Sequence, residues 1–564
     1  MILLSLGISL IVLVLIAGIG NAINIKGVNF LQKSLLTIAL FSYISFWLGL
    51  FTTETVVCAF SAVLILAGTI SWAIHLKNSK YECSWNWNRI YSTGIIIAIL
   101  IIPILLSWQA FTDKQPFEIS RKMFFDLPND NEIPHYLAKA IRNDTYSSPL
   151  FGDWLGSDRP PLQAGFLLML QPVLNLFNFS HEPDFILSYI AQTAWILGAL
   201  SLLSVVVNKR YSFVRYAGIT STTFTGLILV NSVFTWPKLL AAGYLLLSVS
   251  LIIPALSVSR NKDPLPFGLW VSAGTATALA SLSHGASLFA IIPLVLMMMY
   301  HLLTVGFTRL AKCFLFFLGP FVFLQSTWLI WQRFGDPPGY RLIKWHLAGV
   351  LPIDERGLAE TLIDSYREIG LTKAIQFKWE NIRVLFTNGN LSWTPYKEIG
   401  DSSSAVSTDF FGVFAAISWV LPMAIGLVIV YLVKKVLGRS NPTYEPRGVL
   451  FTVLWWISSV LVWSLLMFGP ASTINHQGPL VVGIVPLLVI STALADRSPL
   501  LWLLTAMLQS LIFLYVYTGR LNETVNSGYS TVFAVVLTSV LLLSVFDLIS
   551  LEKRQDLISK LEDS

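Results

Sequence analysis

The feature that most limits the fold of this chain is a series of apolar runs, each about as long as a bilayer is thick, spread over its whole length. A helix that crosses the hydrocarbon core needs about 20 mainly apolar residues. Of the 564 residues, 55% are hydrophobic and 12% are charged, whereas soluble domains carry about 25% charged residues. We therefore expect an all-α polytopic membrane protein with about 15 transmembrane helices. The expected spans are residues 2–18, 35–52, 56–75, 91–111, 185–206, 216–231, 238–257, 267–283, 287–305, 312–331, 411–433, 449–468, 479–495, 499–518 and 530–550.

The charge and the cysteines exclude two other classes of protein. The formal net charge is +6, but the Lys and Arg residues lie in short loops, which indicates membrane topology rather than nucleic-acid binding. The three cysteines (Cys58, Cys83 and Cys313) are scattered, so they predict neither a metal site nor a disulfide framework. The first apolar run lacks a basic start and a cleavage site, and we expect it to be retained as a span.

The distribution of Lys and Arg predicts which loops face the cytoplasm. Basic residues concentrate in the loops at 26–33, 77–89, 209–215, 260–262, 309–312, 434–447, 497 and 553–560. The positive-inside rule places these loops, and therefore the C-terminal tail 551–564, in the cytoplasm. The opposite set of loops is expected outside the plasma (inner) membrane, at 112–184, 236, 281–287, 332–410, 469–478 and 519–530.

One apolar run, Leu162–Phe177, does not fit this alternation as a span. If it crossed the membrane, every basic loop after it would lie outside. It is also short and contains Pro172, so we expect a helix that lies in the outer interface without crossing. Residues Ile133–Arg142 are expected to form a second short interfacial helix in the same loop.

These assignments predict five regions along the chain. They are extra N-terminal helices (1–75), a transmembrane core with an outer catalytic loop at 112–184 (76–331), an outer segment (332–410), C-terminal transmembrane helices (411–550) and a cytoplasmic tail (551–564). The outer segment is expected to contain an amphipathic helix at Leu358–Ile369 and a polar stretch at Asn388–Ser407.

The outer loop at 112–184 carries the strongest candidates for chemistry. Asp126, Asp130 and Glu132 lie within seven residues of one another at an apolar boundary. Two helix starts are expected in the same loop, one at Pro134 and one after Ser157, Asp158 and Arg159. Free N–H groups at helix starts favour bound anions such as phosphate, and they keep a neighbouring carboxylate ionised. An ionised Asp beside a phosphate can act as a general base.

The residues Asp130-Asn131-Glu132-Ile133-Pro134-His135-Tyr136, followed by Arg159-Pro160-Pro161-Leu162, resemble the first outer loop of GT-C fold glycosyltransferases. The resemblance is to the branch of the protein O-mannosyltransferases and the lipid A aminoarabinose transferase, which shows an Asp-Glu pair and then Lys-Pro-Pro-Leu. This chain differs: Asn131 separates the acids, Arg159 replaces Lys, and extra spans precede the loop.

The resemblance implies a GT-C-like fold, a polyprenyl-phosphate sugar donor and inverting transfer at the outer face of the membrane, with a loop Asp as base. The spacing leaves open whether that base is Asp130 or Asp126; we favour Asp130. Glu132 would contact the acceptor or a metal, so a divalent cation is left open and no other cofactor is expected.

Further candidates lie at the other outer turns. Lys238 begins a span on the side where cations are disfavoured, next to Trp236. Cations and a histidine alternate in the outer segment, where they could clamp a phosphate. The donor phosphate would bind Arg159, Lys238, Arg341, Lys344 and His346. Donor or acceptor contacts are expected from Trp236, His284 and His476, whereas His135 and Tyr136 are expected to pack.

The preferred hypothesis is a membrane glycosyltransferase that uses a polyprenyl-phosphate sugar, with a lipid, polysaccharide or protein as acceptor. A flippase or transporter of lipid-linked solutes is the first alternative, although charges within the spans are few. A polymerase or ligase of the O-antigen type is the second, and it would depend on Arg341 and His346 rather than on Asp130.

Overall fold

The computed structural model describes residues 2–78, 94–97, 129–176, 183–208, 213–233, 236–260, 264–303, 306–386, 445–469, 479–524 and 528–562. Within these ranges the regular structure is helical, and one isolated bridge joins Phe151 and Trp154. Eight of the described helices are long and apolar enough to cross a bilayer. The chain is therefore an all-α, multi-pass membrane protein, and the total of about 15 spans remains a prediction. The expected span 91–111, the polar stretch at 388–407 and the expected span 411–433 lie largely or wholly outside the described residues.

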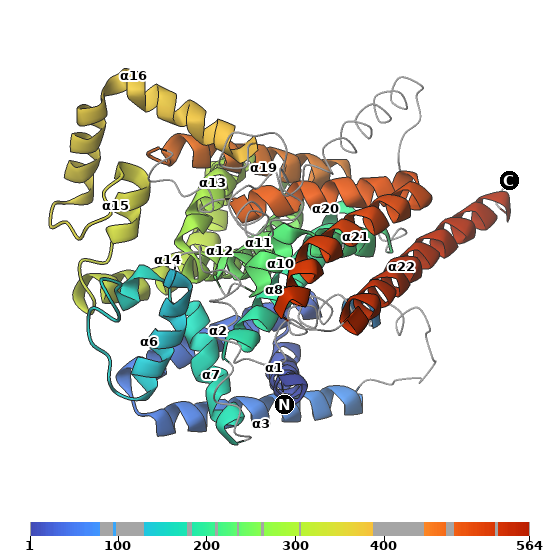
Figure 1. Cartoon of the computed structure of the whole chain (residues 1–564), viewed down its shortest axis with the longest axis horizontal. Coiled ribbons are helices and arrows are strands. Elements are labelled where there is room, and N and C mark those ends of the chain that lie inside the picture. Colours follow the sequence, from blue (N-terminus) through green and yellow to red (C-terminus); the bar gives the residue numbers. More distant parts are fainter. Residues whose placement is uncertain are drawn as a thin grey trace.

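The first three helices, α1 (Ile2–Ala22), α2 (Phe30–Phe51) and α3 (Glu54–Asn78), cover the three N-terminal spans expected from the sequence. The start of α2 is fixed by a capping box, in which Asn29 and Gln32 each accept a backbone N–H from the other at 3.0 Å. Helix α1 packs on both α2 and α3. In Figure 1 the three helices lie together at one edge of the molecule.

The centre of the bundle is formed by α8 (Pro183–Val206), α11 (Lys238–Arg260) and α12 (Phe267–Ser283), whereas α14 (Phe307–Phe334) packs on α12 and leaves most of its surface exposed (Figure 1). Helices α8 and α11 make their closest approach at Gly198, where an added Cβ atom would stand 2.2 Å from the carbonyl oxygen of Gly243. Side chains are therefore excluded at this crossing, and the two backbones pack against each other directly. Helices α13 (Leu288–Leu303), α19 (Pro446–Leu466), α20 (Pro479–Arg497), α21 (Pro499–Thr524) and α22 (Gly528–Glu562) complete the described bundle.

The segment 216–231, expected as one span, is not one continuous helix. Two short helices replace it, α9 (Val214–Thr223) and α10 (Gly226–Val233), with Phe224 and Thr225 between them. The Thr225 hydroxyl accepts the N–H of Ile228 at 3.4 Å, so it caps the start of α10. A capping side chain inside an apolar run interrupted the helix, and hydropathy alone does not detect such a break.

The first outer loop contains both short helices expected there, α6 (Ile133–Arg142) and α7 (Leu162–Leu176), with the 3₁₀ turns η1 (Asn129–Glu132) and η2 (Gly156–Asp158) before them. The expected surface position of α7 is not observed. All residues from 162 to 170 are buried, because α7 packs mainly against α2 and also against α3 and α6. Gly165 permits this contact, since an added Cβ would stand 2.1 Å from the Ser42 carbonyl oxygen. Helix α7 therefore belongs to the bundle and fixes the loop that precedes it.

The outer segment begins after α14 with α15 (Arg341–Ala348) and continues into α16 (Leu358–Phe386). The helix expected at Leu358–Ile369 is confirmed and continues beyond its expected end through a bend at Gly370. In Figure 1 the two arms of α16 meet at a marked angle, and the second arm leads towards α19. At the other end of the chain, α22 runs without interruption to Glu562, so the tail continues the last helix.

Candidate functional site

A buried ion pair between Arg159 and Asp130 lies at the centre of the site. Turn η1 and the start of α6 position Asp130, while η2 and the Pro160-Pro161 sequence before α7 position Arg159. The Arg159 Nη2 atom donates to Asp130 Oδ2, and the two side chains are only 4% and 3% exposed. Burial lowers the pKa of Arg159 to about 9, so the guanidinium remains charged at neutral pH.

Two polar atoms of this pair make no hydrogen bond within the described part of the chain. They are Asp130 Oδ1, which is an acceptor, and Arg159 Nε, which is a donor. Buried polar atoms in folded proteins nearly always have a partner, because an unpaired one costs about 1–3 kcal/mol. The pair therefore offers one acceptor and one charged donor to a ligand.

Trp236 lies beside this pair and carries a second cation. Its ring centroid is 5.1 Å from the Arg159 Cζ atom and 3.9 Å from the Lys238 Nζ atom. Both distances are within the range of cation–π attraction. Trp236 and Lys238 are themselves buried, at the start of α11. The indole thus holds two positive charges close together in a region where little water can screen them.

His284 completes the cluster from the turn between α12 and the 3₁₀ turn η4 (Gly285–Ser287). Its ring centroid is 6.1 Å from that of Trp236, edge to face. Burial first, and then the positive charges of Arg159, Lys238 and His346, hold the pKa of His284 well below its usual value. The ring is therefore neutral at physiological pH.

The tautomer of His284 follows from its hydrogen bond. Its Nδ1 atom accepts the N–H of Ala286 at 3.1 Å, so the ring proton resides on Nε2. Nε2 is buried and has no partner among the described residues. His284 thus adds a neutral N–H donor to the cluster. The Arg159 guanidinium, the Lys238 amine and the His284 N–H thus lie together beside the Asp130 carboxylate, and these three donors suit an anion.

The structure therefore brings together five of the residues singled out from the sequence, which come from three separate turns of the chain: Asp130, Arg159, Trp236, Lys238 and His284. Glu132 is buried at the end of η1, where it precedes α6 without capping it through its side chain. Among the described residues, no group of three or more His, Cys, Asp or Glu side chains could hold a metal ion. Asp126 and His476 lie outside the described residues.

Arg341 makes its hydrogen bonds and ion pairs with Asp153, Asp158 and Leu351 and not with this cluster. Its Nη1 atom donates to the Asp153 carbonyl at 2.5 Å and lies 3.5 Å from Asp158 Oδ2, while Nε donates to the Leu351 carbonyl at 3.0 Å. Its Nη2 atom also pairs with the Asp153 carboxylate, and its guanidinium lies over Trp154 at 5.1 Å. These contacts give Arg341 a structural role, and the expected phosphate contact stays a prediction.

Lys344 is likewise bound within the outer segment, where its Nζ atom donates to the carbonyl oxygens of Asp354, at 2.6 Å, and Arg356. His346, two residues further along α15, stacks on Trp345 with 5.0 Å between ring centroids.

Sequence reasoning missed the residue that holds the Arg159 turn, Asp336. Its carboxylate accepts the Ser148 hydroxyl at 2.6 Å and the Ser157 N–H at 2.7 Å, and its carbonyl oxygen accepts the Ser157 hydroxyl at 3.0 Å. Gln332 donates to the Ser157 carbonyl at 2.9 Å. We call Asp336 and Gln332 the anchor. Because Ser157 is bound at its N–H, hydroxyl and carbonyl, the anchor fixes the backbone two residues before Arg159.

Asp158 was expected to cap the helix that follows, but it caps the preceding turn instead. Its Oδ2 atom accepts the Leu155 N–H at 3.0 Å. Burial raises the pKa of Asp158 to about 6, although Arg341 and the Leu155 N–H oppose this shift. Asp158 thus links η2 to α15 through Arg341.

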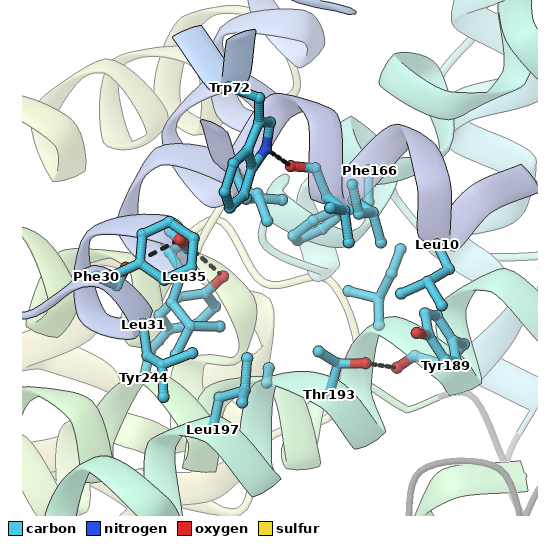
Figure 2. A pocket seen from close by; sticks show the side chains of 17 residues that line it. Leu10, Phe30, Leu31, Leu35, Trp72, Phe166, Tyr189, Thr193, Leu197 and Tyr244 are labelled. Carbon is cyan, nitrogen blue, oxygen red and sulfur yellow. Dashed lines mark hydrogen bonds between the residues drawn. The ribbon is translucent and has the colours of Figure 1, made fainter. Parts of the chain in front are cut away.

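An apolar cavity of about 320 Å³ lies among α1, α2, α3, α7, α8 and α11. Figure 2 shows Leu10, Trp72, Phe166, Thr193 and Tyr244 on its walls. Tyr244 follows Lys238 by six residues on the same helix, which is about 9 Å along its axis. The full lining is Leu10, Leu13, Val14, Ala17, Phe30, Leu31, Ser34, Leu35, Ile38, Trp72, Phe166, Tyr189, Ile190, Thr193, Ala194, Leu197 and Tyr244.

Comparisons with known proteins give one structural likeness. No family model matches the chain, and no curated protein matches it. Among solved structures, the chain is similar to ArnT from Cupriavidus metallidurans bound to undecaprenyl phosphate, with 11% sequence identity and a TM-score of 0.41. The match covers 83% of this chain and 77% of that one.

Proposed function

We propose that this protein is an inverting glycosyltransferase that moves a sugar from a polyprenyl-phosphate donor to an acceptor at the outer face of the plasma membrane. The observation that carries the proposal is the buried cluster of Arg159, Lys238 and His284 around Trp236, with the Asp130 carboxylate against it. Cations and N–H donors in a site that excludes water stabilise developing negative charge far better than they would in water.

Each side chain has a role in a balanced transfer step. Asp130 takes the proton from the acceptor hydroxyl or amine through Oδ1, the oxygen that accepts no hydrogen bond from a described residue. The acceptor atom then forms a bond to the anomeric carbon as the bond from that carbon to the phosphate oxygen breaks. The bonding electrons leave with the phosphate, whose charge Arg159, Lys238 and the His284 N–H stabilise. Attack opposite the leaving phosphate inverts the anomeric centre.

The prenyl tail of the donor fits the apolar cavity. The cavity wall shares α11 with Lys238, and its lining is almost entirely hydrocarbon and aromatic. A phosphate at Lys238 and a chain passing Tyr244 would place the charged and apolar parts of one lipid in matching surroundings. Undecaprenyl phosphate is therefore a suitable first probe of binding.

A decisive experiment separates binding from chemistry. We expect Asp130→Asn to lower the rate of sugar transfer about 100-fold or more, the usual contribution of a general base, while the protein still binds undecaprenyl phosphate in nanodiscs. Arg159→Ala should instead weaken that binding. Asp144→Asn, a change of an exposed acid in the same loop, is the matched control. Transfer by Asp130→Asn at the wild-type rate from any undecaprenyl-phosphate-linked sugar would refute the proposal.

A flippase for lipid-linked solutes is the second candidate, because the same cation cluster would recognise a carrier phosphate during transport. The two candidates differ in what Asp130 does. A flippase would move labelled lipid across proteoliposome membranes with no change in its sugar, whereas a transferase would consume the donor only when an acceptor is present.

A further inference from the structure

The second arm of α16, residues 371–386, carries an exposed apolar stripe. Leu371, Ile375 and Trp379 recur every fourth residue and are 78%, 61% and 63% exposed. Residues spaced in this way lie on one face of a helix. On the opposite face of the same arm lie Lys373 and Glu380, while Thr372 and Gln376 flank the stripe and Arg383 follows Trp379 by one turn. The arm is therefore amphipathic, with an apolar face that no described part of the chain covers.

Hydrogen bonds fix the depth of this arm relative to a candidate membrane span. Asn381 Nδ2 donates to the carbonyl oxygens of Ser464 and Met467, both at 3.0 Å. Lys378 Nζ donates to the Met467 carbonyl and, at 3.3 Å, to that of Phe468. These carbonyls are at the C-terminal end of α19, whose candidate span is Pro446–Leu466. The arm therefore lies level with the boundary between hydrocarbon and headgroups.

The apolar surface of α19 reaches the same level. Leu461 and Leu465 are exposed near its end, as expected for side chains that face lipid. On α16, Ala374 and Asn381 form the buried edge towards α19, and Phe377 packs on Phe468 with 5.8 Å between ring centroids. The apolar stripe of α16 lies beside this edge. The lipid that surrounds the end of α19 is therefore the apolar environment nearest to the stripe.

We propose that the second arm of α16 lies in the interface of the outer leaflet, with Leu371, Ile375 and Trp379 among the acyl chains and Lys373 at the headgroups. The occupant of the stripe is phospholipid. Amphipathic helices with Trp on the apolar face and cations on the polar face bind bilayer surfaces in this way. The proposal does not depend on the proposed transferase activity.

Spin labelling of the full-length protein tests this proposal. After replacement of Cys58, Cys83 and Cys313 by Ser, a nitroxide is attached to Ile375→Cys or to its control, Gln376→Cys, in phospholipid vesicles. Oxygen concentrates in the acyl region, whereas a nickel chelate stays in water. We expect the ratio of oxygen to nickel accessibility to be several-fold higher at 375 than at 376.

Two results would overturn the proposal. Equal ratios at 375 and 376, with high nickel accessibility, would show that the stripe is in water. Protection of 375 from both reagents would show that protein covers it. The circular dichroism of both labelled variants reports folding, because an intact bundle keeps its helical signal. Neither readout requires a donor or an acceptor, so failure here is separate from failure of the transferase proposal.

Discussion

Replacing Asp336 by Asn should loosen the turn that presents Arg159. The anchor carboxylate accepts two short hydrogen bonds, from the Ser148 hydroxyl and the Ser157 N–H. An Asn side chain has one acceptor oxygen in place of two, so one of these donors must face an NH₂ group. A hydrogen bond to a charged group contributes about 1.5–3 kcal/mol, and we expect the turn to lose about that much local stability.

The free energy converts directly into an exchange rate. Each 1.4 kcal/mol is a factor of about ten in the equilibrium for local opening, so a loss of about 1.5–3 kcal/mol accelerates amide exchange about 10- to 150-fold. Hydrogen exchange of peptides covering residues 155–159 measures this change in the purified protein. Asp364→Asn is the matched control, because Asp364 is 42% exposed and pairs with Arg356 at 3.2 Å. Exposed pairs contribute about 0–1 kcal/mol.

Wild-type exchange at residues 155–159 in the Asp336→Asn protein would refute this reasoning, since the anchor would then contribute nothing to holding the turn. Faster exchange at every peptide would also contradict it, because that result indicates global rather than local destabilisation. Faster exchange confined to this turn, with weaker binding of undecaprenyl phosphate, is the expected pattern.

Other perturbations test the remaining parts of the site. Burial raises the pKa of Asp158 to about 6, so the folded chain binds its proton more tightly than the unfolded chain. Stability should therefore fall by about 2–3 kcal/mol as the pH rises from about 4 to 6, and thermal unfolding of Asp158→Asn should lack this component. Arg341→Lys should lower thermal stability and change the dissociation constant for undecaprenyl phosphate by no more than about twofold. Arg159→Lys should raise that dissociation constant about tenfold, because Lys lacks the forked donors of Arg. Thr193→Phe, which fills the cavity, should weaken binding of undecaprenyl phosphate but not of a short-chain prenyl phosphate; equal losses for both would argue against the cavity as the tail site.

The residues of the cluster could be singled out from the sequence because all of them lie at the ends of expected spans. Asp130, Arg159, Trp236, Lys238 and His284 each lie at a boundary between an apolar run and a turn. The positive-inside rule places these turns on one side of the membrane. Since a bundle of spans brings its turns together at one end, a cation or acid at such a boundary is a good candidate even without knowledge of the packing.

The roles of Arg341, Lys344 and Asp336 could not be predicted in this way. The sequence around a cation in the outer segment does not show whether its side chain faces a ligand or, like that of Arg341, binds Asp153 and a backbone carbonyl. Asp336 lies 179 residues from Ser157, and no local pattern connects the two positions. The helix break at Phe224 and Thr225 was not predicted for a related reason. One polar capping residue hardly changes the mean hydropathy of a window as long as a span.

The bend at Gly370 has a consequence for how the two arms of α16 are oriented. Gly370 has φ 71° and ψ 167°, a backbone region that is open almost exclusively to glycine. No neighbouring atom lies within 4 Å of the position a Cβ would take, so the restriction on this position comes from its torsion angles alone. With an alanine there, the 29 residues would favour one rod about 43 Å long. Such a rod cannot follow both directions at once, and whichever arm kept its attachment would swing the other away. A single methyl group is therefore enough to decide whether the two arms of α16 keep their separate directions.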